Sequence, residues 1–126
     1  MKKTINFLLF SFIFLFLTLA VFAQNSVVSV NVRIGGQDYT FNNGTDVTAQ
    51  IELREAKIAG NNSEIKYISL MRVRVIERND LSIWGRLFNE EVQEFNRQIK
   101  VLEDLNKRLR GEISQLNRVL RKFRRN

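Results

Sequence analysis

The stretch that decides the fold runs from Phe88 to Phe123 and reads FNEEVQEFNRQIKVLEDLNKRLRGEISQLNRVLRKF. Apolar residues recur in it at alternating spacings of three and four, which is the pattern of a helix with one apolar seam. The a positions of this heptad are Val92, Ile99, Asn106, Ile113 and Leu120. The d positions are Phe88, Phe95, Leu102, Leu109, Leu116 and Phe123. About five unbroken heptads predict a long coiled-coil helix, which we place in residues 81–126.

One polar residue, Asn106, interrupts the seam. A single Asn at an a position is known to fix register and oligomeric state at some cost in stability. Because Ile or Val dominates at a and Leu or Phe at d, the pattern favours two parallel strands. We therefore expect a homo-oligomer built on these a and d residues, with a dimer favoured over a trimer. Leu105 and Val119 at g widen the apolar stripe, so a trimer or a helix folded back on its own domain stays an alternative.

Residues 24–80 show a different period. Apolar and polar residues alternate in four segments of this region, which is typical of half-buried strands. These segments are 28–34, 39–41, 47–54 and 65–76. Gly35-Gly36 lies between the first two and favours a hairpin turn, since Gly accepts positive φ. The sequence thus predicts an α+β fold: a small domain over 24–80, holding an antiparallel β-meander of about four strands, followed by the C-terminal helix.

Trp84 is the only tryptophan and lies at the predicted junction of the strands and the helix. We expect it to pack the start of the helix onto the sheet. The alternative is that Trp84 anchors a partner.

The first 23 residues predict a targeting segment. Met1-Lys2-Lys3 is basic, and the uncharged run FLLFSFIFLFLTLAVFA follows at 7–23. Val21 and Ala23 place small residues before a cleavage site, as in a secretory signal peptide. The alternative is an uncleaved anchor that holds residues 5–23 in the membrane. Both lead us to expect an exported protein, in the periplasm, on the cell surface or outside the cell.

Composition argues against an enzyme. The 126 residues include no Cys, His or Pro. Disulfides, Cys or His metal sites, a thiol nucleophile and an imidazole base are therefore excluded. No phosphate-binding loop or calcium loop occurs either. We expect no catalytic residues, no cofactor and no metal.

The net charge of +7 is unevenly spread. Acidic and basic residues balance over 24–112, and all the surplus of the region after residue 23 lies in the last fourteen residues. The cations there are Arg118, Arg121, Lys122, Arg124 and Arg125. This cluster predicts a site for a polyanion such as a lipid headgroup or an envelope polymer. The alternative is that the cations only complement the helix dipole. Nucleic acid is not expected, because no stacking aromatics are interleaved with the cations.

These patterns lead to three functional hypotheses. The first is an exported, non-catalytic structural or assembly protein of the cell envelope or surface, which homo-oligomerises through the C-terminal coiled coil. The second is a polyanion- or client-binding module that uses the basic C-terminal end. Its layout is similar to that of periplasmic holdase chaperones, although the order of elements differs and no motif matches. The third is a membrane-anchored subunit of an envelope complex.

Overall fold

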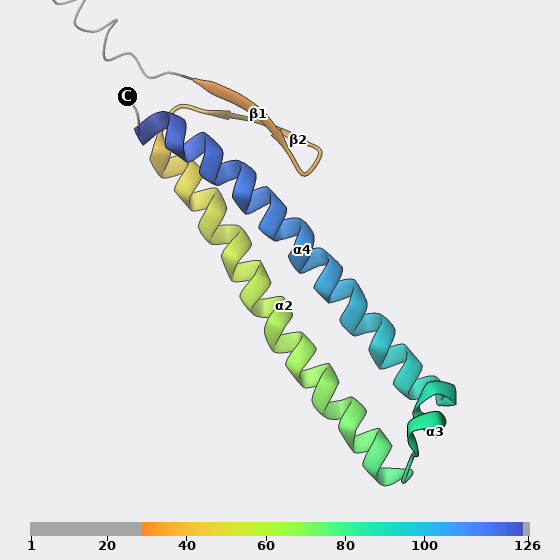
Figure 1. Cartoon of the computed structure of the whole chain (residues 1–126). Helices are drawn as coiled ribbons and strands as arrows, with labels where there is room; N and C mark the ends of the chain where they lie inside the picture. The colour runs from red at the N-terminus through yellow and green to blue at the C-terminus, as the bar shows by residue number, and fades with distance from the viewer. Residues whose placement is uncertain (1–28, 125–126) are drawn as a thin grey trace, which may run out of the picture.

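Two long helices lie side by side and antiparallel in the computed structural model, which describes residues 29–124 (Figure 1). They are α2 (Gly44–Arg78) and α4 (Glu90–Arg124), each of 35 residues and so about 52 Å long at 1.5 Å per residue. The short helix α3 (Ile83–Phe88) joins them at one end. A two-stranded sheet lies at the other end, beside the start of α2 and the end of α4 (Figure 1). The long C-terminal helix is thus confirmed, and it begins at Glu90.

The strands β1 (Val30–Ile34) and β2 (Gln37–Phe41) form the predicted hairpin. They pair antiparallel, from Val30 opposite Phe41 to Ile34 opposite Gln37. Gly35 and Gly36 make the turn with φ of 61° and 80°, values that other residues rarely adopt. The alternation in β1 puts its apolar side chains on the face that covers the helices.

The other two predicted strands are wrong, because residues 44–78 form the helix α2. Asn43 caps its start: the Asn43 side chain accepts a hydrogen bond of 2.8 Å from the backbone N–H of Asp46. Positions spaced alternately by four and three then form one stripe along the helix, with polar residues at Arg54, Asn61 and Arg72. The apolar members of the stripe are Val47, Ile51, Ile58, Ile65, Ile68 and Val75. All six of these apolar residues are β-branched and favour strands locally, but burial of one helical stripe against α4 outweighs that preference.

The predicted seam of α4 packs on this stripe of α2 within one chain. Val92, Ile99, Asn106 and Leu116 are buried there. The remaining seam residues of α4 are half-buried, namely Phe95, Leu102, Leu109, Ile113, Leu120 and Phe123. Phe88 lies outside α4, at the end of α3, and is exposed. The helix does fold back, along most of its length on another helix and at its end also on the sheet. An interchain coiled coil through the same residues stays a prediction, and it would require α2 to leave this face.

The largest apolar cluster lies where the sheet meets the helices. Val30, Ile34 and Phe41 from the sheet pack with Val47 and Ile51 of α2 and with two α4 residues, which are Leu116 and Val119. Farther from the sheet, the interior of the helical hairpin formed by α2 and α4 is thinner and is buried only along the seam. The sheet therefore stabilises the end of this helical hairpin at which α2 starts and α4 ends.

Candidate functional site

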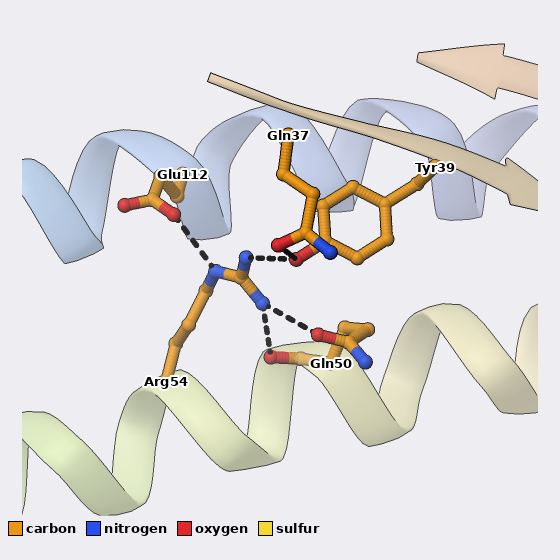
Figure 2. A network of polar contacts seen from close by, with 5 residues as sticks. All are labelled: Gln37, Tyr39, Gln50, Arg54 and Glu112. Carbon is orange, nitrogen blue, oxygen red and sulfur yellow. Dashed lines mark hydrogen bonds and ion pairs between the residues drawn. The ribbon is translucent and has the colours of Figure 1, made fainter. Parts of the chain in front are cut away.

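Arg54 occupies a seam position of α2 and is only 6% exposed. Its guanidinium joins three elements, as Figure 2 shows. Nε donates to Glu112 of α4 at 3.2 Å, and Nη2 donates to the hydroxyl of Tyr39 in β2 at 3.2 Å. Nη1 donates to the backbone oxygen and side chain of Gln50 at 3.1 and 2.8 Å. The Tyr39 hydroxyl in turn donates to Gln37 at 3.2 Å. This network ties the sheet to both helices.

The guanidinium of Arg54 stays protonated in the folded chain. Burial alone would lower the pKa of the Arg54 guanidinium, but the hydrogen bonds with Tyr39 and Glu112 outweigh burial and raise that pKa above its ordinary value. A raised pKa in the folded state means that the stabilisation is complete below the pKa of the unfolded chain. It is lost only as pH rises through the still higher folded value. The network therefore holds throughout the neutral and moderately alkaline range.

Asn106 forms a second polar layer, nearer the middle of the hairpin. Its amide nitrogen donates to Asn62 at 2.9 Å, and its amide oxygen accepts from Asn61 at 2.9 Å. Both partners belong to α2, so the seam asparagine pairs within the chain. A buried amide with both ends satisfied resists a shift of one helix along the other. Asn106 therefore sets the register of the hairpin.

Neither polar layer offers a free reactive group. Within residues 29–124, every buried side-chain nitrogen or oxygen has a hydrogen-bond partner. In the same range no acidic cluster is placed to hold a metal ion. Over these residues, too, no helix is long and apolar enough to cross a membrane. The Arg54 and Asn106 layers thus shape the fold, and the candidate functional surfaces lie at the two ends of the hairpin.

The first surface is the tip, which we define as the apolar side chains of α3. Ser82 caps this helix by accepting a 3.1 Å hydrogen bond from the N–H of Gly85. The tip side chains are strongly exposed: Ile83 73%, Trp84 72%, Leu87 51% and Phe88 82%. Trp84 does not pack against the sheet, contrary to the expectation, because α2 carries the junction to the opposite end of the molecule (Figure 1). Its exposure fits the alternative, a partner-binding anchor.

Acidic residues surround the tip. Residues 77–91 carry four carboxylates and two guanidiniums, a net charge of −2. One pair is joined across the turn, since Arg78 Nη2 lies 3.4 Å from a Glu91 carboxylate oxygen. Arg86 is the other cation, and the remaining carboxylates belong to Glu77, Asp80 and Glu90.

The second surface is the base groove, between the start of α2 and the end of α4. It has a volume of about 520 Å³. Its α2 wall consists of Gly44, Thr45, Thr48, Ala49 and Glu52, and its α4 wall of Leu120, Phe123 and Arg124. Because most of the α2 side chains are small, Leu120 and Phe123 are only half-buried there. The groove is apolar at its centre and charged at its edge.

The predicted polyanion cluster lies at the same end of α4, and Arg124 is its member that lines the groove. Arg118, Arg121, Lys122 and Arg124 are all exposed. None of these four forms an ion pair with any residue of the described range 29–124. Arg125 lies outside the described residues. The cationic cluster was predictable from the sequence. The groove was not, because its α2 wall belongs to a region that we predicted as strands.

Comparison of this chain with models of known families, with curated proteins and with solved structures finds no match.

Arg54→Met should destabilise the fold by about 3 kcal/mol, because it leaves Glu112 with an unpaired and partly buried charge. Urea unfolding followed by circular dichroism measures this loss. The matched control is Arg97→Met, which removes an exposed Arg97–Glu94 pair on one helix and should cost less than about 1 kcal/mol. Equal losses in the two variants would show that the Arg54 network does not hold the sheet to the hairpin.

Proposed function

We propose that this chain is an exported, non-catalytic assembly protein that presents the tip to a protein partner. The observation that carries the proposal is the exposure of four large apolar side chains on one short helix, at the end of a long hairpin. Exposed clusters of this kind mark interaction sites, and Trp is among the residues that dominate binding energy at protein interfaces.

The tip is large enough to support binding. A buried Trp or Phe removes about 150–250 Å² from water. At about 25 cal/mol per Å², covering the exposed parts of Trp84 and Phe88 contributes on the order of 8 kcal/mol before the costs of association. Those costs are several kcal/mol or more, so the tip by itself supports weak to moderate affinity. Such affinity suits assembly by repeated contacts.

The hairpin supplies reach and direction. The seam and its two polar layers hold α2 and α4 together along their length, so the tip stays about 52 Å from the sheet end. If the N-terminal segment stays as an uncleaved anchor, it tethers the chain at the sheet end, because β1 is the first described element after it. The tip then projects away from the membrane, whereas a cleaved signal peptide leaves the whole hairpin free of it.

Replacing the tip aromatics should abolish binding to apolar protein surfaces. The variant is Trp84→Ser with Phe88→Ser, and the probe is reduced, carboxymethylated lactalbumin, which stays unfolded and exposes apolar segments. We expect the wild-type chain to bind the fluorescently labelled probe and the variant to bind it at least tenfold more weakly, measured by fluorescence anisotropy.

The matched control is Leu53→Ser with Tyr67→Ser, which removes two exposed apolar side chains from the flank of α2. It should bind the probe as the wild type does. Unfolding curves of both variants should match the wild type, since all four side chains are exposed. Equal loss of binding in the two variants, or no binding by the wild type, would contradict the proposal.

A second candidate function is polyanion binding at the sheet end. The observation that favours it is the set of four exposed cations, Arg118, Arg121, Lys122 and Arg124, without ion pairs among residues 29–124. Unpaired cations on one helix end create a positive potential that attracts anionic surfaces.

Changing these four cations to Gln should abolish cosedimentation with phosphatidylglycerol vesicles, and the binding of the wild type should fall as salt rises. A control variant removes four exposed lysines elsewhere, namely Lys57, Lys66, Lys100 and Lys107. This control has the same net charge and should keep most of the binding. If both variants lose binding alike, only net charge matters and the cluster is no site.

A further inference from the structure

We propose that the tip of one copy docks in the base groove of a second copy, so that chains associate head to tail. This inference rests on the proposed function, because it names the partner of the same tip. It uses two surfaces that lie at opposite ends of one molecule, so neither end blocks the other (Figure 1).

The two surfaces match in chemistry. The tip offers Trp84 and Phe88, and the groove offers the half-buried side chains of Leu120 and Phe123. The groove is open and has a volume of about 520 Å³, which is enough for an aromatic side chain with a neighbour. The small residues Thr48 and Ala49 on its α2 wall keep that space free.

The two surfaces also match in charge. The tip region, residues 77–91, carries a net charge of −2. The groove itself is lined by one carboxylate, Glu52, and one cation, Arg124, and the positive charge comes from the end of α4 beside it, where residues 118–124 carry four cations and no acidic residue. Opposite net charges steer the two surfaces together and disfavour wrong pairings. The single groove carboxylate, that of Glu52, even has a counterpart in Arg86 of the tip.

The same charges argue against the other occupants. Two tips facing each other would bring two negative regions together, and two grooves would bring two positive regions together. Both symmetric dimers are therefore opposed by like charge. An anionic bilayer is a poor partner for the tip for the same reason. A contact between different surfaces on identical chains does not close on itself, and it builds an open chain or a ring.

Head-to-tail docking leaves the hairpin closed. The seam residues Val92, Ile99 and Asn106 stay buried within each chain, as they are in the structure. The contact therefore differs from an interchain coiled coil, which would have to open the hairpin to reach them. This difference makes the two kinds of oligomer separable by mutation.

The experiment mixes two variants of the exported protein, each of which lacks one of the two proposed surfaces. The tip variant is Trp84→Ser with Phe88→Ser, and it keeps an intact groove. The groove variant is Arg121→Glu with Arg124→Glu, and it keeps an intact tip. Light scattering behind a sizing column measures mass, and tryptophan emission reports the tip. Because Trp84 is the only Trp, emission in the mixture comes from the groove variant alone.

We expect wild-type mass to rise above one chain with concentration and each variant alone to stay at one chain. An equimolar mixture should form a complex of two chains, with tryptophan emission shifted to shorter wavelength as Trp84 leaves water. The flank variant, Leu53→Ser with Tyr67→Ser, should associate as the wild type does. Rescue by mixing requires two different surfaces, so no symmetric contact gives this result.

Three results would overturn the inference: a mixture that stays at one chain; association of both variants alone, as an interchain coiled coil predicts; or a wild type that remains monomeric, whether or not its basic end binds anionic vesicles. If the tip nevertheless binds unfolded lactalbumin, the proposed function stands and only the identity of the partner is wrong. If the tip binds neither, both fail.

Discussion

The antiparallel packing of α2 on α4 positions every other element of residues 29–124. Apolar residues provide most of the contact, but two polar layers decide the register. Arg54 reaches Glu112, Gln50 and Tyr39, and Asn106 pairs with Asn61 and Asn62. A slip of one helical turn would separate these partners and leave a buried guanidinium and a buried amide unsatisfied, at a cost of several kcal/mol.

This packing determines where the functional surfaces lie. Because the two helices have equal length, their ends coincide, and the connection α3 is held at the far end without a surface to cover it. The start of α2 and the end of α4 meet at the other end, where the sheet adds apolar cover and the base groove forms. One helical hairpin thus has an apolar tip near acidic residues at one end and an apolar groove near basic residues at the other. The length of α2 and α4 sets the distance between the tip and the groove.

Part of this arrangement was predictable from the sequence. The heptad identifies α4, the alternation around Gly35-Gly36 identifies the β hairpin, and the single seam asparagine identifies a register-setting residue. The helix α2 was missed because its Ile and Val residues also alternate in short windows. The 4–3 spacing from Val47 to Val75 would have found it, had Arg54, Asn61 and Arg72 been allowed as seam positions. The groove and the exposure of Trp84 could not be predicted, since both depend on residues 44–78 forming one long helix.

The most direct test of this account is a disulfide between the two helices, and a chain without cysteine suits it well. Asn61→Cys with Asn106→Cys places two thiols at facing positions of α2 and α4, where the amide groups of the two side chains now meet at 2.9 Å. A disulfide forms when helix motion brings the two Cβ atoms to about 4 Å. Under mild oxidation at low concentration we expect one crosslink within a single chain, seen by mass spectrometry as the loss of two hydrogens without a change in chain number. Asn61→Cys with Asn96→Cys should stay unlinked under the same conditions, because the register separates these residues. Disulfides that form only between two chains would contradict the account, because they would mean that the seam joins different molecules.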